Sequence, residues 1–250
     1  GRLIDAVALR LGLDPNEVRR RNCIKTEQMP FAHGVEAFGD DLHYDSGDYV
    51  GLMDRLFAQF DYDGLKADAA RRRQNGEMVG DGYALFVEES GLGPADGVRI
   101  AIDTSGFVEV VTGGASIGQG FETVIAQVAA EALGVDYQRV RVVHGQTDRI
   151  AFGIGAHASR ATVMTASATH NAALLVRAKA LEFAAAHMQT PADALTIVDG
   201  VVRHTGRDGG PSMRLGEIAK GLEPTSKTLG VREPGLSALG WFRVDHQVSP

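Results

Sequence analysis

The chain has 250 residues, of which 44% are hydrophobic and 23% charged, and a formal net charge of −7. This composition excludes a wholly disordered chain, and the negative charge argues against a general nucleic-acid or anionic-membrane surface. No apolar stretch approaches the roughly 20 residues that span a bilayer. The single cysteine, Cys23, excludes an internal disulfide framework and a multi-cysteine metal site, and it fits a reducing, cytoplasmic setting.

Residues 1–78 are predicted to form an N-terminal helical segment, already under way at the first residue as in a piece of a longer protein. Gly12 suits the end of a first helix, and Asp14 suits the cap of a second. Glu17 is expected to reach back as in a capping box. Residues 30–48 show no period and are expected to be a loop. The expected helices lie at about 1–11, at 14–22 and, as a pair, within 49–74.

Residues 79–250 are predicted to form an α+β core of mixed strands and packed helices. The long helix is rich in alanine, which permits close packing and implies burial. The expected elements are a strand at 83–88, a hairpin at 98–103 and 107–112, a helix at 122–133, a strand at 140–144, a long helix at 161–187 and a hairpin at 195–198 and 201–204.

Two glycine-rich loops lead into helix starts and form the candidate site. The first is Gly113–Gly120, before the helix at 122–133. The second is Phe152–Arg160, before the long helix, with hydroxyls at Ser159 and Thr162 and a guanidinium at Arg160 that suit a bound anion. Glycine lets backbone approach a ligand closely, and helix N-termini attract anions. The pair therefore predicts one shared phosphate-bearing ligand, although tight turns, an N-cap at Ser159 and an ordinary salt bridge at Arg160 would explain the same residues.

A rival hypothesis uses the first loop as a hydrolase nucleophile elbow, because Gly114–Gly118 matches Gly-x-Ser-x-Gly with Ser116 as nucleophile. The other triad members would come from Asp136, Asp148, His157 and His170. Against it, the strand before the loop is expected to pair as an antiparallel hairpin, and no glycine-rich oxyanion segment precedes it.

Several motifs together resemble the molybdenum hydroxylase family, which includes xanthine dehydrogenase, aldehyde oxidase and carbon monoxide dehydrogenase. The run Gly118–Gly134, with its Gly-Gln-Gly-x-Glu-Thr start, is similar to the molybdopterin-binding segment of the large subunit. The resemblance continues in order along most of the chain, through residues 11–22, 140–145, 147–148, 153–155 and 159–160.

The resemblance implies that this chain binds the pterin and phosphates of a molybdenum–molybdopterin cofactor, or of its cytosine dinucleotide form. The residues it implicates are Gly118, Gln119, Gly120, Glu122, Thr123, Gly155, Ala158, Ser159, Arg160, Ala161 and Thr162. It also implies hydroxylation of an aldehyde, heterocycle or related small molecule, or CO oxidation. FAD and 2Fe-2S clusters are expected on partner subunits or domains, beside the remainder of the molybdenum subunit.

The sequence departs from the family pattern at positions that matter for the site. Ala158 and Ala161 stand where members usually have glycine and serine, and Gln146 stands where aspartate is common. Glu233 imitates the family's catalytic glutamate but is expected to be an exposed loop carboxylate, so no catalytic residue is predicted in this chain. The isolated chain is therefore expected to be inactive. A non-catalytic scaffold that keeps the fold without cofactor is the alternative, and the substrate stays open.

Overall fold

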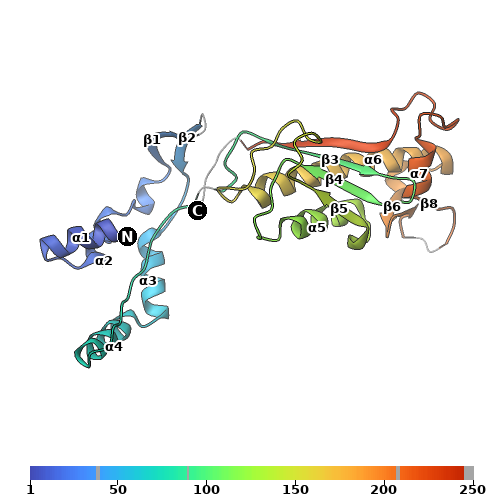
Figure 1. Cartoon of the computed structure of the whole chain (residues 1–250). Helices are drawn as coiled ribbons and strands as arrows, with labels where there is room; N and C mark the ends of the chain where they lie inside the picture. Colours follow the sequence, from blue (N-terminus) through green and yellow to red (C-terminus); the bar gives the residue numbers. More distant parts are fainter. Residues whose placement is uncertain (38–39, 89, 207–208, 245–250) are drawn as a thin grey trace. The chain divides into compact units, whose positions relative to one another are not determined.

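The computed structural model describes residues 1–37, 40–88, 90–206 and 209–244. They form two compact units, one within Gly1–Glu89 and one within Ser90–His246 (Figure 1). The structure groups residues 79–88 with the N-terminal helices, whereas the sequence suggested a boundary after residue 78. Positions 89, 207–208 and 245–250 of the expected core lie outside the described residues. Among the described residues, no helix is long and apolar enough to cross a membrane.

The first unit contains the four expected helices. The predicted end of the first helix and the predicted cap at the start of the second are both confirmed. Gly12 ends the first helix with φ 66°, and the Asp14 carboxylate caps the second by accepting from the backbone N–H groups of Asn16 and Glu17 at 2.6 and 3.2 Å. The Glu17 side chain, however, accepts from Arg21 at 2.7 Å instead of closing a capping box. The elements are α1 Arg2–Leu11, α2 Pro15–Asn22, η1 Thr26–Gln28, β1 Phe31–Ala37, β2 Asp40–Tyr44, α3 Tyr49–Gln59 and α4 Tyr62–Gln74.

The expectation of a loop at 30–48 is wrong, because β1 and β2 pair there as an antiparallel hairpin. An aromatic contact joins the two strands: the His33 ring of β1 packs edge-on against Tyr44 of β2 at 4.7 Å, and against Phe31 of its own strand at 5.4 Å. Such cross-strand contacts stabilise a hairpin without the hydrophobic alternation by which sequence patterns detect strands.

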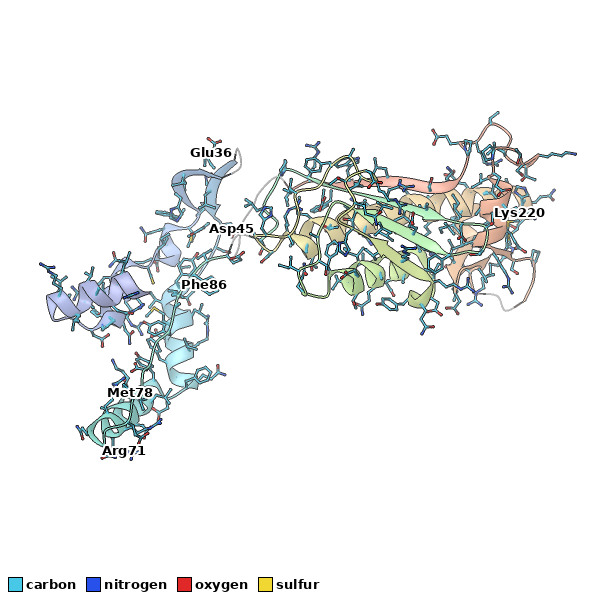
Figure 2. All side chains as sticks on the ribbon, in the orientation of Figure 1. Glu36, Asp45, Arg71, Met78, Phe86 and Lys220 are labelled. Atoms are coloured by element: carbon cyan, nitrogen blue, oxygen red, sulfur yellow. The ribbon has the colours of Figure 1, made fainter. Side chains whose placement is uncertain are left out.

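The expected strand at 83–88 is also absent from the described residues, where this segment is extended but unpaired. Tyr83 is fixed by its side chain rather than by a backbone ladder, since its hydroxyl donates to Asn16 Oδ1 and the Arg19 guanidinium lies over its ring at 4.7 Å. On either side of Tyr83, Met78 and Phe86 are exposed (Figure 2). Aromatic anchoring, and not sheet formation, therefore holds Tyr83 in place.

The second unit is built on a four-stranded sheet in the order β5-β4-β3-β9. The strand β3 pairs antiparallel with β4 and β9, whereas β4 and β5 are parallel because α5 connects them. One face of the sheet buries Val98, Ile100, Val108 and Val110 in the core that α5 and α6 complete (Figure 1). The strands are β3 Asp96–Ile102, β4 Val108–Thr112, β5 Val140–Val143 and β9 Leu236–Phe242, and the helices beside them are α5 Phe121–Leu133 and α6 Ser167–Met188.

The remaining elements close the far end of the core. A three-stranded antiparallel sheet has the order β6-β7-β8, and its first two strands form the expected hairpin around Asp199 and Gly200. These elements are η2 Tyr137–Arg139, η4 Ala192–Ala194, β6 Leu195–Val198, β7 Val201–His204, β8 Met213–Arg214 and α7 Leu215–Gly221.

The alanine-rich helix buries one side in the core, and its first turn differs from the expectation. Residues Ala161–Ala166 form a π-helical segment, η3, before the regular α6 begins. Within α6 the small side chains allow close approach, since a Cβ added to Gly240 of β9 would lie 2.3 Å from the backbone nitrogen of Ala172. Single π-helical turns inside helices are frequent at functional sites.

Candidate functional site

The first glycine loop, residues 113–120, connects β4 to α5. Gly118 and Gly120 have φ of 96° and 77°, values that favour glycine, and a Cβ added at either would meet nothing within 4 Å. The Gln119 side chain folds back on the loop: its Oε1 accepts from the Ile117 backbone at 2.7 Å, and its Nε2 donates to the Ala115 carbonyl at 3.1 Å. The loop is thus braced by its own glutamine and open to a ligand at its glycines.

Glu122, in the first turn of α5, is held by two side chains from other segments. Its Oε2 accepts from the Ser116 hydroxyl at 2.9 Å, and its Oε1 lies 2.8 Å from His144 Nε2. The pKa of Glu122 is lowered, first by a hydrogen bond from its own backbone N–H and then by those from His144 and Ser116. Thr123 is exposed beside it. The carboxylate is therefore ionised and engaged within the protein.

These contacts do not support Ser116 as a hydrolase nucleophile. The Ser116 hydroxyl meets Glu122, and His144 lies on the far side of that carboxylate, whereas a triad needs the histidine next to the serine. Asp136 caps η2 by accepting from the Gln138 backbone at 2.9 Å. One argument used against the hydrolase is itself wrong, since β4 pairs in parallel with β5 as well as antiparallel with β3. The decisive observation is that Glu122 lies between Ser116 and His144, so that the histidine cannot accept the serine proton.

The second glycine loop lies against the face of the sheet that is turned away from α5 and α6. After β5 the chain is held to this face by Arg149, which donates to Glu109 of β4 at 2.6 Å. The hydrogen bond from Arg149 lowers the pKa of Glu109, and burial, which would raise it, is the smaller cause. The Phe152 ring then packs against Trp241 of β9 with centroids 6.0 Å apart. These contacts place Gly153–Ile154–Gly155 beside the end of β4.

The two glycine loops meet in direct backbone contact at Gly113 and Gly153. A Cβ added at Gly113 would lie 2.2 Å from the Phe152 carbonyl oxygen, and one added at Gly153 would lie 2.4 Å from Gly113 Cα. Only glycine permits so close an approach at both positions. In addition, α5 packs against η3, the turn that follows the second loop. The structure thus brings together the two loops, each at the start of a helix, that the sequence singled out separately.

Arg160 is fully buried, which corrects the expectation that its guanidinium is presented to an anion. Its Nε donates to the Leu92 carbonyl at 2.9 Å, Nη2 to the Ala95 carbonyl at 3.2 Å, and Nη1 to both Asp96 and the Gly155 carbonyl, at 3.3 and 3.1 Å. Burial lowers the pKa of Arg160, and Asp96 opposes that effect. Arg160 therefore anchors the second loop to the segment before β3.

Ala158 and Ser159 occupy the left-handed region, with φ of 41° and 50°. This conformation is unfavourable for residues with a Cβ, which explains why a glycine would suit position 158. The Ala158 carbonyl accepts from Gly91 at 3.0 Å and so keeps the turn in place. Ser159 and Thr162 are exposed, Ala161 is half-buried, and Gly155, with φ 81°, has open space where a Cβ would be. The exposed side chains of this segment include the His157 imidazole and the hydroxyls of Ser159 and Thr162.

Sequence reasoning missed His144, Asp96 and the Gly113–Gly153 contact. A histidine directly after a strand carries no signal of a partner 22 positions earlier, and the Asp96–Arg160 pair spans 64 positions. The glycines were visible, but their mutual contact was not. Glu233 lies exposed in the turn before β9.

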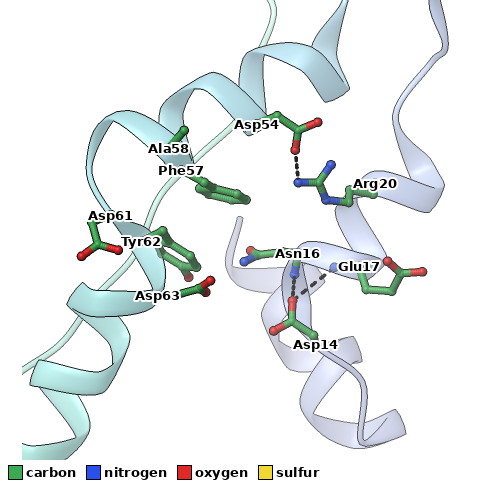
Figure 3. Close-up of a pocket in the computed structure, with 10 residues that line it drawn as sticks. All are labelled: Asp14, Asn16, Glu17, Arg20, Asp54, Phe57, Ala58, Asp61, Tyr62 and Asp63. Atoms are coloured by element: carbon green, nitrogen blue, oxygen red, sulfur yellow. Dashed lines mark hydrogen bonds and ion pairs between the residues drawn. The ribbon is translucent and has the colours of Figure 1, made fainter.

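A separate cavity of about 860 Å³ lies between α2, α3 and α4 of the first unit (Figure 3). Its polar side chains already serve the fold: Asp14 caps α2, and Arg20 pairs with Asp54. The stacked rings of Phe57 and Tyr62, with centroids 4.5 Å apart, line another part of it. We assign this cavity no ligand.

Comparison with known proteins finds relatives among the subunits of dehydrogenases. It is 33% identical over 237 residues to the 6-hydroxypseudooxynicotine dehydrogenase complex subunit gamma of Paenarthrobacter nicotinovorans, covering 95% of this chain and 30% of that protein. It is 32% identical over 201 residues to the carbon monoxide dehydrogenase large chain of Hydrogenophaga pseudoflava, covering 75% and 24%.

Solved structures show the same relationship. Carbon monoxide dehydrogenase from Oligotropha carboxidovorans matches with a TM-score of 0.70 and 28% identity, over 99% of this chain and 32% of that one. Quinoline 2-oxidoreductase from Pseudomonas putida 86 matches with a TM-score of 0.69 and 28% identity, over 98% and 32%. The chain thus spans about a third or less of these relatives. Its residues 55–249 match the family described as Molybdopterin cofactor-binding domain, and the chain belongs to that family.

Proposed function

We propose that the two joined glycine loops hold the pterin and phosphate portion of a molybdenum–molybdopterin cofactor, or of its cytosine dinucleotide form. The backbone contact between Gly113 and Gly153 carries this proposal, because it joins two helix-start loops into one surface. Family membership supports the identity of the ligand. When bound, the cofactor supplies the redox chemistry for hydroxylating a carbon substrate or oxidising CO.

The groups available in the loops fit such a ligand. Gly118, Gly120 and Gly155 leave open the space that a Cβ would occupy, so a flat heterocycle or a phosphate can approach the backbone N–H groups. Ser159 and Thr162 add exposed hydroxyls at the second helix start. The Gln119 amide, which now bridges Ile117 and Ala115, can exchange those backbone contacts for the ligand's polar edge. Arg160 acts from within, by fixing the second loop.

The whole protein would be an oxidoreductase in which this chain forms only part of the site. The relatives are named as a subunit of a complex and as a large chain. By analogy, the remainder of the molybdenum subunit would complete the pocket for a small-molecule substrate. Flavin and 2Fe-2S groups would lie on partner subunits or domains. We place the protein in the cytoplasm because its single cysteine, Cys23, suits a reducing compartment.

One observation favours a second candidate, a scaffold that keeps this fold without cofactor. Ala158 holds a left-handed conformation that glycine adopts without strain, and its methyl group would narrow any close approach by a ligand. A domain released from cofactor binding would tolerate such a substitution.

The test is the cofactor content of the assembled enzyme that contains this chain. Molybdenum by mass spectrometry and pterin by fluorescence are expected in a one-to-one ratio with the chain. Gly118→Val and Gly155→Val should each lower both at least tenfold, because a side chain would fill the space left open for the ligand. Gly206→Val is the matched control, since Gly206 has a similar φ of 70° and equally open surroundings but lies outside the loops. An intact complex without molybdenum and pterin would favour the scaffold.

A further inference from the structure

The Glu122 carboxylate joins three elements of the second unit. Ser116 reaches it from the first glycine loop at 2.9 Å, and His144 reaches it from the end of β5 at 2.8 Å. Glu122 itself belongs to the first turn of α5. The loop, the helix start and the strand end therefore share one hydrogen-bonded centre.

The chemistry of the three groups fixes how the protons are arranged. An ionised carboxylate only accepts hydrogen bonds, so both the Ser116 hydroxyl and His144 Nε2 donate to it. The His144 ring is held in place because it packs edge-on against Phe121, with centroids 5.6 Å apart and an interplanar angle of 87°. The imidazole is thus aimed at Glu122 by its packing.

This arrangement controls what the first loop presents to a ligand. A free carboxylate at a helix start would compete with a ligand's anionic groups for the same backbone N–H groups. Here both Glu122 oxygens are engaged by donors from the protein, while Gln119 braces the loop from inside. The contacts of Glu122 and Gln119 together define the course of residues 115–120.

We infer that His144 and Ser116 are positioning residues, which act through Glu122 to hold the backbone of residues 115–120 in the form that receives the cofactor. This inference rests on the proposed function. Neither residue needs to touch the ligand, and their effect is transmitted through the carboxylate.

Hydrogen exchange of the cofactor-free chain tests the brace directly. His144→Phe keeps a ring against Phe121 but removes the donor, and Ser116→Ala removes the other donor. Each should speed exchange of the amides at 115–120 by about threefold to tenfold, the effect of losing one modest hydrogen bond. His144→Gln, which keeps an N–H that can reach Glu122, should restore slow exchange. His170→Phe, the same change at an exposed position of α6, should leave the loop unchanged.

Cofactor content of the assembled enzyme tests the second half of the inference. His144→Phe should lower molybdenum and pterin content at least threefold, and His144→Gln should recover it. If the amides at 115–120 exchange hydrogen in His144→Phe at the same rate as in the wild type, His144 does not hold the loop and the inference is wrong. Faster exchange with full cofactor content would overturn the positioning role and leave the proposed function standing, provided that Gly118→Val still loses cofactor. If Gly118→Val also keeps its cofactor, the proposed function fails and the inference fails with it.

Discussion

The two glycine loops, each at the start of a helical segment, are held in place by different means. The first is held by hydrogen bonds at the surface, through Gln119, Ser116 and Glu122. The second is held from below by Arg160, which is fully buried with Asp96. Surface hydrogen bonds contribute modestly and exchange with water, whereas an unpaired buried charge is costly. The comparison teaches that the first loop can adjust to a ligand, while the second is a fixed platform.

Removing the buried anchor should give the largest effect. Arg160→Met leaves Asp96 without its cationic partner in the core and is expected to destabilise the second unit by about 3–5 kcal/mol. Trp241, the only tryptophan of the chain, lies in this unit and reports its urea unfolding by fluorescence. Arg149→Met is the matched control. Its pair with Glu109 is roughly 30% exposed on both sides. Its loss should therefore cost at most about 1 kcal/mol. Equal costs for the two variants would contradict the role of Arg160 as the buried anchor of the second loop.

Relieving the backbone strain of the second loop should raise the stability of the second unit, by less than the loss of Arg160 lowers it. Ala158→Gly removes the penalty for a left-handed Cβ-bearing residue and is expected to stabilise the second unit by about 1 kcal/mol. The measurement is again the urea midpoint by Trp241 fluorescence. Ala151→Gly, an exposed alanine of the same connection without a positive φ, should give no gain. Stabilisation by both changes would point to general loop flexibility instead.

Acid should reduce the stabilising contribution that ionised Glu122 makes at the first loop, and the reduction should be small. The pKa of Glu122 is lowered in the folded protein below its ordinary value of 4.5. Its contribution is therefore complete above about pH 4.5 and is lost as the pH falls through the lowered folded value. We expect the difference in urea midpoint between wild type and Glu122→Gln to be present at pH 7 and to narrow below pH 4.5. A difference that is independent of pH would show that the charge of Glu122 is not what braces the loop.

Sequence periodicity predicted most helices and the two hairpins of the second unit, because their apolar residues repeat at the period of the element. It failed where side-chain contacts replace that pattern. The hairpin at β1 and β2 is stabilised by aromatic rings, and the segment around Tyr83 is anchored to α2 without pairing. Neither arrangement leaves a regular apolar repeat for periodicity to detect.

The sequence identifies the candidate site as two glycine loops that share a ligand, but it gives none of the contacts that join or hold them. Glycine content and helix-start position identify residues 113–120 and 152–160, since those properties are local. The contact of Gly113 with Gly153, the pairing of Arg160 with Asp96 and the binding of Glu122 by His144 are properties of the folded chain. For this reason the sequence predicts a ligand contact for Arg160, whereas in the folded chain Arg160 anchors the second loop from the core.

The bonds of Arg160 also bear on how the second loop acquires its shape. Its partners Leu92 and Asp96 lie 68 and 64 positions earlier in the chain. The loop therefore cannot form from neighbouring residues alone and must wait for distant parts of the polypeptide to meet, an event whose closure entropy slows assembly. A synthetic peptide of residues 150–166 should accordingly lack the left-handed turn, and during folding this platform should mature after the β3–β4 hairpin has formed.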